Sequence, residues 1–189
     1  MDHHRAASRR LITVARALTY KAAVITVVIT AVVPALMATA CSSGTSRLQN
    51  GARSIDQLVS EYMEAVVAGD TAAMHALRLS EYEHNEILWP ELPASRPEFN
   101  MPIAFAWENL NLHSRRDANR VLADFSDRHI EIERVDCRKG VTEYPTLKVH
   151  GDCWIIGRDG RTGIREEFKL FGSIVESEGR YKIIGIVSE

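Results

Sequence analysis

The sequence has none of the short motifs by which many enzymes and metal proteins are recognised. It contains no glycine-rich phosphate-binding loop, no G-x-S-x-G turn, no H-E-x-x-H or H-x-x-E-H pattern and no C-x-x-C pair. Its seven histidines show no metal-ligand spacing. Such motifs are local in sequence, so their absence is informative. We expect no metal and no cofactor.

An excess of basic residues is also lacking. The chain has 23 Lys and Arg against 25 Asp and Glu, and residues 1–40 hold five of the basic and one of the acidic residues. The remaining 149 of 189 residues therefore carry 18 basic and 24 acidic side chains, a net charge of −6. Nucleic-acid-binding domains need a basic surface, so we expect no nucleic-acid partner. This length predicts one domain.

No apolar run is long enough for an ordinary membrane span. Basic residues concentrate in residues 1–21, and an uncharged, mostly apolar run at 22–37 ends in Ala38-Thr39-Ala40. This order is typical of a secretory signal peptide, which we place at residues 1–40. The run is shorter than the about 20 apolar residues of a membrane span, and Pro34 interrupts it. The alternative is a retained anchor helix.

Cys41 follows this small-residue site directly. Together with Ser42-Ser43-Gly44 it resembles the lipobox of bacterial lipoproteins, although Ala38 stands where that family usually has Leu. The resemblance implies that Cys41 is lipidated and becomes the mature N-terminus. It implies an exported protein anchored in the cell envelope, with its domain on the periplasmic or extracellular side. The same site would also suit an ordinary signal peptidase. Residues 41–53 are polar and aperiodic, which predicts a flexible tether.

Two other cysteines remain, Cys137 and Cys153. An even pair in an oxidising compartment is typical of a disulfide. If the chain reverses near Tyr144-Pro145, the two face each other across a hairpin. If it reverses at Lys139-Gly140, they lie too far apart to bond. In that case they are two small buried apolar residues.

An amphipathic helix is predicted from Ser54 onward. Ser54 and Gln57 fit a capping box, and Gly69 ends the pattern. Two short helices are expected at 70–77 and 81–88. The apolar stripe of the first helix recurs at helical spacing and comprises Ile55, Leu58, Val59, Tyr62, Met63, Val66 and Val67.

Four prolines exclude a regular element from residues 89–102, and a longer helix is predicted from there to about residue 126. Strands follow, three of them within 146–188. Each of these three carries one glycine near its middle, at Gly151, Gly172 and Gly185. Glycine inside a strand marks a bend or a close approach, so a curled antiparallel sheet is expected, with helices in its concave face.

The order of these elements resembles the nuclear transport factor 2-like (cystatin-like) fold. The residues that carry the likeness are Val66-Val67-Ala68-Gly69-Asp70, a helix end with a Gly-Asp pair before a small second helix. The resemblance covers about residues 54–189 and implies an α+β domain shaped as a cone. In that family the cone encloses a pocket, and members include isomerases, dehydratases, cyclases and non-enzymatic binding domains.

Three residues are candidate catalytic groups. His150 and Asp152 lie two apart on one strand and could form an acid–base pair; the alternative is a solvent-exposed face. Tyr62 could point into the cone, as a tyrosine does in the isomerase members; the alternative is a core side chain.

Trp89, Glu91 and Trp107 are candidate pocket residues. Glu91, between prolines, would have a raised pKa if desolvated; the alternative is that it caps backbone or meets water. We expect a non-enzymatic, lipid-anchored domain that binds a small apolar ligand or a protein partner. The alternatives are an isomerase-, dehydratase- or cyclase-type enzyme, and a homodimerisation module.

Overall fold

The first helix, α1 (Ile55–Val67), begins at its predicted cap. The backbone N–H of Gln57 donates to Ser54 Oγ at 3.1 Å, and the Gln57 side chain accepts from the N–H of Arg53 at 2.9 Å. Gly69, with φ +67°, lies just beyond its end, where glycine adopts the left-handed conformation without steric cost. The computed structural model describes residues 48–189, which belong to one compact unit.

Short helical turns connect α1 to the long helix α4 (Ile103–Phe125). The Ser80–Glu83 capping box is formed, and α4 runs without a break. The proline-rich stretch forms single 3-10 turns, because proline fixes φ at a value that suits the first residues of a turn. These connecting elements are α2 (Thr71–Ala76), α3 (Glu81–Glu83), a short π-helix (His84–Leu88) and three 3-10 turns (Trp89–Glu91, Pro93–Ser95, Pro97–Phe99).

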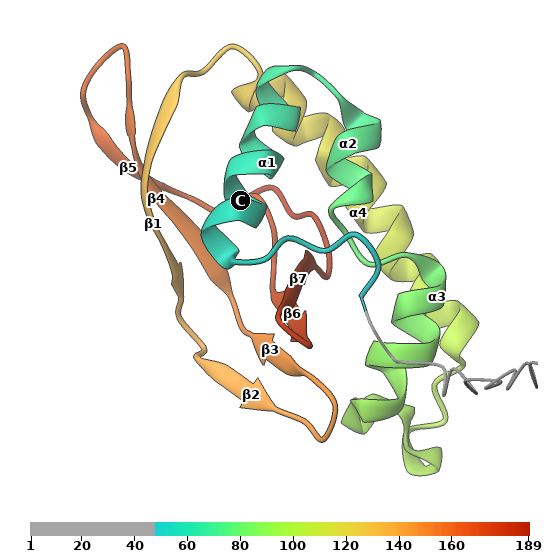
Figure 1. The fold of residues 1–189 in the computed structure, drawn as a ribbon. Coiled ribbons are helices and arrows are strands. Elements are labelled where there is room, and N and C mark those ends of the chain that lie inside the picture. Colours follow the sequence, from blue (N-terminus) through green and yellow to red (C-terminus); the bar gives the residue numbers. More distant parts are fainter. Residues whose placement is uncertain (1–47) are drawn as a thin grey trace, which may run out of the picture. The chain divides into compact units, whose positions relative to one another are not determined.

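The strands form two antiparallel sheets (Figure 1). The first has the order β1-β4-β5, and the second has the order β2-β3-β6-β7. A long hairpin runs through both sheets. One arm contains β1 and β2 and the other contains β3 and β4, so that β2 pairs with β3 in one sheet and β1 pairs with β4 in the other. The strands are β1 (Ile130–Cys137), β2 (Val141–Glu143), β3 (Lys148–His150), β4 (Cys153–Asp159), β5 (Arg165–Phe168), β6 (Ile174–Ser177) and β7 (Arg180–Ile183).

Gly172 and Gly185 are hydrogen-bonded neighbours between the two sheets. The N–H of Cys153 donates to the carbonyl of Gly172 at 2.7 Å, and the N–H of Gly172 donates to that of Gly185 at 3.0 Å. Gly151 lies between β3 and β4, and its N–H donates to the carbonyl of Gly140 at 2.8 Å. The sequence placed each glycine inside one continuous strand. Instead the strands are interrupted there, with Asp152 at φ +54°, so the bend separates two sheets.

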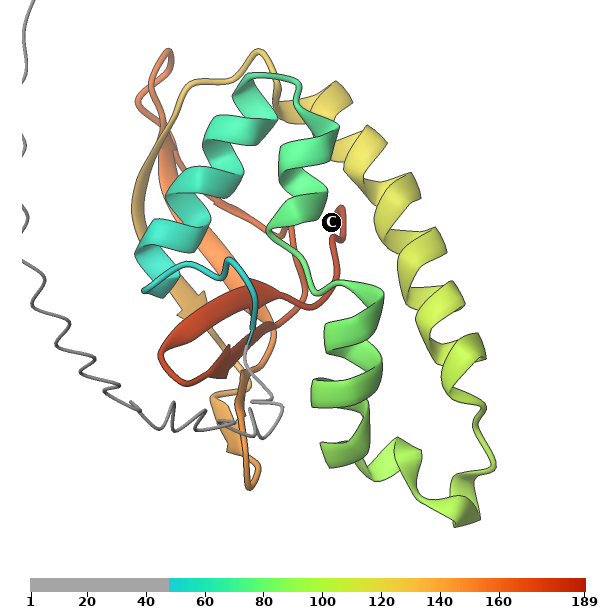
Figure 2. The same ribbon diagram turned by 45° about the vertical axis from the view of Figure 1, so that its right-hand side comes forward.

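The helices lie on one side of the β1-β4-β5 sheet (Figure 2). One buried face of α1, from Leu58 to Val66, packs with strand residues such as Ile155 and Phe168 in the main core cluster, whose buried members are at most 6 % exposed. Helix α4 contacts the C-terminal segment, where the N–H of Ile186 donates to Ser114 Oγ at 3.2 Å. Side chains therefore fill the space between α1 and the sheets.

The folded domain begins earlier than the sequence suggests. Leu48 and Ala52 are buried, and Ala52 exchanges two backbone hydrogen bonds with Tyr181 at 3.1 and 2.9 Å. The predicted tether at 41–53 is therefore wrong for residues 48–53. Cys41 and the predicted signal peptide lie outside the described residues. Among residues 48–189, no helix has the length and apolar character to cross a membrane.

The structure decides between the two alternatives for Cys137 and Cys153. The hairpin reverses after Glu143, where the N–H of Tyr144 donates to the carbonyl of Leu147 at 2.8 Å. Cys137 and Cys153 are then directly opposite in β1 and β4, with Cα atoms 3.9 Å apart. They form a disulfide.

Candidate functional site

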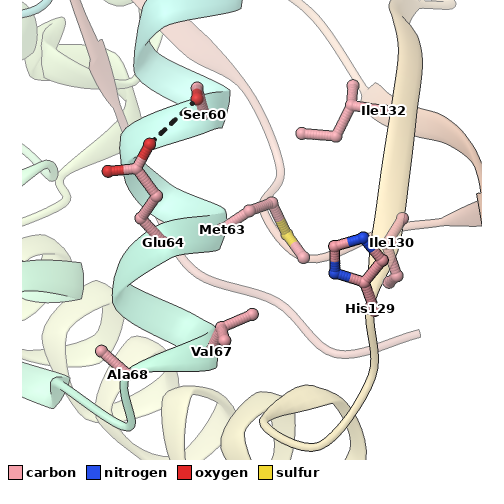
Figure 3. A pocket seen from close by; sticks show the side chains of 8 residues that line it. All are labelled: Ser60, Met63, Glu64, Val67, Ala68, His129, Ile130 and Ile132. Carbon is pink, nitrogen blue, oxygen red and sulfur yellow. Dashed lines mark hydrogen bonds between the residues drawn. The ribbon is translucent and has the colours of Figure 1, made fainter. Parts of the chain in front are cut away.

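A groove of about 420 Å³ opens between α1 and the start of β1 (Figure 3). Most of its wall is apolar, with a serine, a glutamate and a histidine at the margin. Its lining comprises Ser60, Met63, Glu64, Val67 and Ala68 from α1 and the residue after it, and His129, Ile130 and Ile132 from the other wall.

The groove exposes apolar side chains that nothing in the described structure covers. Val67 is 53 % exposed and Ile132 is 37 % exposed, whereas Met63 between them is 6 % exposed. On the helix, Ser60, Met63, Glu64 and Val67 are spaced by three or four residues and so share one face. The apolar stripe of α1 is thus wider than the core needs, and its edge forms one wall.

The wall opposite α1 is the start of β1, and close contact between β1 and β4 sets its position. A Cβ atom on Gly157 would lie 2.8 Å from Ile130 Cγ2 and 2.9 Å from the carbonyl oxygen of Glu131, so only glycine lets β1 approach β4 this closely. The carbonyl of His129 accepts from the N–H of Gly160 at 2.7 Å. Within the described sheets β1 pairs with β4 alone, so its other edge is open.

The lining of the groove includes one acidic residue, Glu64. Ser60 Oγ donates to Glu64 Oε1 at 3.3 Å, as Figure 3 shows. Glu133, which follows Ile132 in β1, does not belong to the lining and pairs with Arg158 and Arg165 at 3.1 and 2.7 Å. The groove therefore presents apolar side chains and hydrogen-bond acceptors to a molecule that binds in it.

His150 and Asp152 do not act on each other. His150 Nε2 lies 2.9 Å from Glu176 Oε2, and Asp152 lies 3.2 Å from Lys169 Nζ. The hydrogen bond from Lys169 lowers the pKa of Asp152. Asp152 also adopts a left-handed backbone conformation, which breaks the strand between the two residues. The predicted acid–base pair is therefore not formed.

Tyr62 is a core side chain. It is fully buried, donates its hydroxyl hydrogen to the carbonyl of Leu170 at 3.2 Å and meets the ring of Phe171 edge-on at 5.6 Å. Burial raises the pKa of Tyr62 far above its usual range. The phenol is committed to the fold and does not face the groove.

The three predicted pocket residues lie elsewhere in the domain. The rings of Trp89 and Trp107 lie on His84, at 5.8 and 5.4 Å between ring centres. Glu91 accepts a hydrogen bond from Thr146 Oγ1 at 2.6 Å, across to the β2–β3 turn. None of the three belongs to the lining of the groove.

Between Leu48 and Glu189, no three His, Cys, Asp or Glu side chains come together as a metal site. Comparisons of the chain with models of known families, with curated proteins and with solved structures found no match. The groove itself was missed by sequence reasoning, which assigned Val67 to the core stripe. The one available signal was that the stripe holds seven apolar residues, more than one buried face of a short helix requires.

Proposed function

We propose that this chain is an exported, lipid-anchored, non-enzymatic protein whose α1–β1 groove binds an extended apolar segment of a partner protein. The observation that carries the proposal is the pairing of exposed Val67 and Ile132 across a groove beside an open strand edge. Exposed apolar surface with a polar margin is typical of interaction sites. The acidic margin at Glu64 favours a segment flanked by basic residues.

A protein segment suits this groove better than a small ligand does. Sites for small ligands bury about 70–90 % of the ligand surface, and this groove has walls on two sides, α1 and β1. An extended peptide can lay alternate side chains between Met63 and Ile132 while its backbone hydrogen-bonds to the open edge of β1. Strand addition of this kind draws affinity from the backbone and specificity from side-chain pockets.

We assign the domain to the nuclear transport factor 2-like class within this proposal. The α+β composition, the Gly69-Asp70 helix end and the bend at Gly151, Gly172 and Gly185 support that assignment. Because core side chains fill the space inside the helices and sheets, binding is placed in the outer groove and not in a cone cavity. The three residues named for the isomerase-type alternative do not converge, since His150 pairs with Glu176, Asp152 pairs with Lys169 and Tyr62 lies in the core.

A peptide-display selection on purified residues 42–189 tests the groove. We expect enriched peptides with apolar residues at alternate positions and basic flanks. Binding of a synthetic enriched peptide, measured by calorimetry, should weaken at least about ten-fold in the double variant Val67→Ser, Ile132→Ser, because two exposed apolar contacts are lost.

The matched control is Ile164→Ser, which removes an exposed isoleucine from the loop between β4 and β5. It should bind the peptide as the wild type does. Equal affinity of the peptide for the double variant would refute the groove assignment. Concentration-dependent self-association lost in the double variant would instead identify a second copy of the chain as the occupant. Tight one-to-one binding of the apolar dye anilinonaphthalene sulfonate, without any peptide, would favour a small ligand.

A further inference from the structure

Exposed apolar side chains concentrate where the chain enters α4. Phe99, Met101, Phe105 and Leu112 are between 43 % and 68 % exposed. They are four of the nine large apolar side chains that are exposed among residues 48–189, although they come from a single stretch of 14 residues. None of them belongs to the lining of the α1–β1 groove. We call these four side chains the α4 apolar face.

The packing of α4 turns the helical part of this face outward. Phe105 and Leu112 are seven residues apart, which is about two turns, so they lie on the same side of the helix. The opposite side carries Ser114, Ala118 and Val121, which are buried. Because the inner side of α4 is held by the core, its outer side presents Phe105 and Leu112 in a fixed orientation.

Two arginines follow the apolar face along the helix. Arg115 and Arg116 come three and four residues after Leu112 and so lie beside it. Arg115 is exposed, and Arg116 pairs with Asp117 at 2.9 Å. A hollow of about 480 Å³ is lined by Glu108, Asn111, Leu112, Arg115, Arg116 and Asn119. Aromatic and aliphatic side chains beside arginines are typical of helices that lie in the interface of a lipid bilayer, where the cations meet headgroup phosphates.

The described chain begins beside the segment that leads to this face. Leu48 packs in one buried cluster with Ile87 and Leu88. Those two residues belong to the π-helix that continues into the proline-rich turns and then into α4. The same π-helix contacts α4 directly, since the ring centre of His84 lies 5.4 Å from that of Trp107. The N-terminal connection and the start of α4 therefore share one part of the domain.

Cys41 is too close to Leu48 in sequence for the domain to stand far from a membrane. Leu48 comes seven residues after Cys41, and a chain of that length reaches at most about 25 Å. We propose that the α4 apolar face docks on the lipid surface to which Cys41 anchors the chain, with its four apolar side chains at the boundary between headgroups and acyl chains. This inference rests on the anchor in the proposed function.

Docking in this way leaves the α1–β1 groove open to a partner. In Figures 1 and 2 the proline-rich turns and the start of α4 lie at one end of the domain, and the end of α1 and the start of β1 lie at the other. A tether alone sets no orientation, but it holds the apolar face at a high effective concentration beside the lipid. The docked domain presents its groove away from the bilayer.

Tryptophan fluorescence on vesicles tests the orientation. Cys137 and Cys153 are bonded to each other, so the thiol of Cys41 couples residues 41–189 selectively to phosphatidylcholine vesicles that carry a maleimide lipid. This coupling holds the domain on a membrane whether or not a cell lipidates Cys41. Phe105→Trp places an indole in the apolar face. Ile164→Trp, in the loop between β4 and β5, is the matched control, because Phe105 and Ile164 are 59 % and 58 % exposed.

Brominated phosphatidylcholine, which quenches indoles that enter the bilayer, should reduce the emission of Phe105→Trp by a larger fraction than that of the wild type. Ile164→Trp should lose no larger a fraction than the wild type. Adding Phe99→Ser and Leu112→Ser to Phe105→Trp should abolish the extra quenching, because the apolar contact with lipid is removed. Equal quenching of Phe105→Trp and Ile164→Trp would overturn the proposal. It would leave the anchor itself untouched, since the coupling replaces the lipid on Cys41.

Sedimentation of uncoupled residues 42–189 separates lipid from a second copy of the chain as the occupant of the face. The domain should remain monomeric at the concentrations used for coupling. Self-association that disappears in the double variant Phe105→Ser, Leu112→Ser, together with no extra quenching of Phe105→Trp, would assign the face to a dimer and refute lipid docking.

Discussion

Lys182 and Glu83 form an ion pair in the interior of the domain, with Nζ and Oε2 2.9 Å apart and side chains 6 % and 1 % exposed. The same carboxylate accepts from the backbone N–H groups of Ser80 and Gln49, each at 2.7 Å. One carboxylate therefore joins the N-terminal segment, the start of α3 and the strand β7. These three parts are far apart in the sequence, so the pair fixes their relative positions.

Removal of the lysine should destabilise the domain strongly. Lys182→Met leaves the Glu83 charge buried with its backbone donors alone, and loss of one member of a buried pair costs about 3–5 kcal/mol. At about 2–4 °C per kcal/mol, Tm should fall by about 6 °C or more. Lys148→Met, at an exposed pair with Glu143, is the control and should leave Tm unchanged within error. Equal effects of the two substitutions in calorimetric scans would contradict this account.

The pKa of Glu83 predicts a loss of stability in acid. Burial alone would raise this pKa, but the hydrogen bonds from Ser80, Lys182 and Gln49 lower it below its usual value. The folded state therefore binds the proton less readily than the unfolded state. The stabilisation is complete above the ordinary glutamate pKa of about 4.3 and is lost as the pH falls through the lower folded value.

Denaturant unfolding across this acidic range checks the prediction. The free energy of unfolding should decrease as the pH is lowered below about 5, and more steeply in the wild type than in Glu83→Gln, which cannot ionise. Glu83→Gln should itself be less stable at neutral pH, because Lys182 is left unpaired. Parallel pH profiles for the two proteins would show that Glu83 does not carry the effect.

The Cys137–Cys153 disulfide should stabilise the domain, since it closes a loop of 16 residues in the unfolded chain. The chain-entropy account gives about 3 kcal/mol for a loop of this length. Residues 42–189 should show no free thiol in denaturant without reductant and two after reduction, and reduction should lower Tm. Two titratable thiols before reduction would contradict the disulfide.

The sequence predicted much of the local structure and little of the candidate sites. The cap at Ser54 depends on neighbours within three residues and forms as predicted, and Asp70 and Ser80 cap the two short helices through equally local contacts. The groove depends on contacts across the fold, such as the close approach of Gly157 to Ile130. No local pattern distinguishes an apolar residue of α1 that faces the groove from one that the core covers.

The tether and the catalytic candidates show the same limit. Leu48 lies in a stretch of polar residues, and it is buried because residues such as Leu79, Ile87 and Val175 gather around it. The alternation that places His150 and Asp152 on one face assumes an unbroken strand. The left-handed φ of Asp152 breaks that alternation, and aspartate adopts this conformation more readily than most residues.

Cys41 is the position that tests the proposed anchor. If it is lipidated, Cys41→Ala in the full-length chain should move the protein from the membrane fraction to the soluble fraction and change its migration on a denaturing gel. The cause would be the loss of the acyl chains, which bind membranes by burial of their CH₂ groups. Cys153→Ala is the control, because it removes a cysteine without touching the N-terminus. An unchanged membrane fraction after Cys41→Ala would indicate that the apolar run at 22–37 is the anchor.

Two glycines offer a matched test of the packing beneath the groove. Gly157→Ala would place a methyl group 2.8 Å from Ile130 Cγ2 and 2.9 Å from the carbonyl oxygen of Glu131. The backbone atom cannot yield without moving β1, so a cost of about 1–3 kcal/mol is expected, with weaker peptide binding because Ile130 and Ile132 move. Gly172→Ala meets its nearest atoms at ordinary distances of 3.9 and 4.0 Å and should change stability and binding little. If denaturant unfolding finds the two variants equally stable, β1 is held less tightly against β4 than the contacts of Gly157 require.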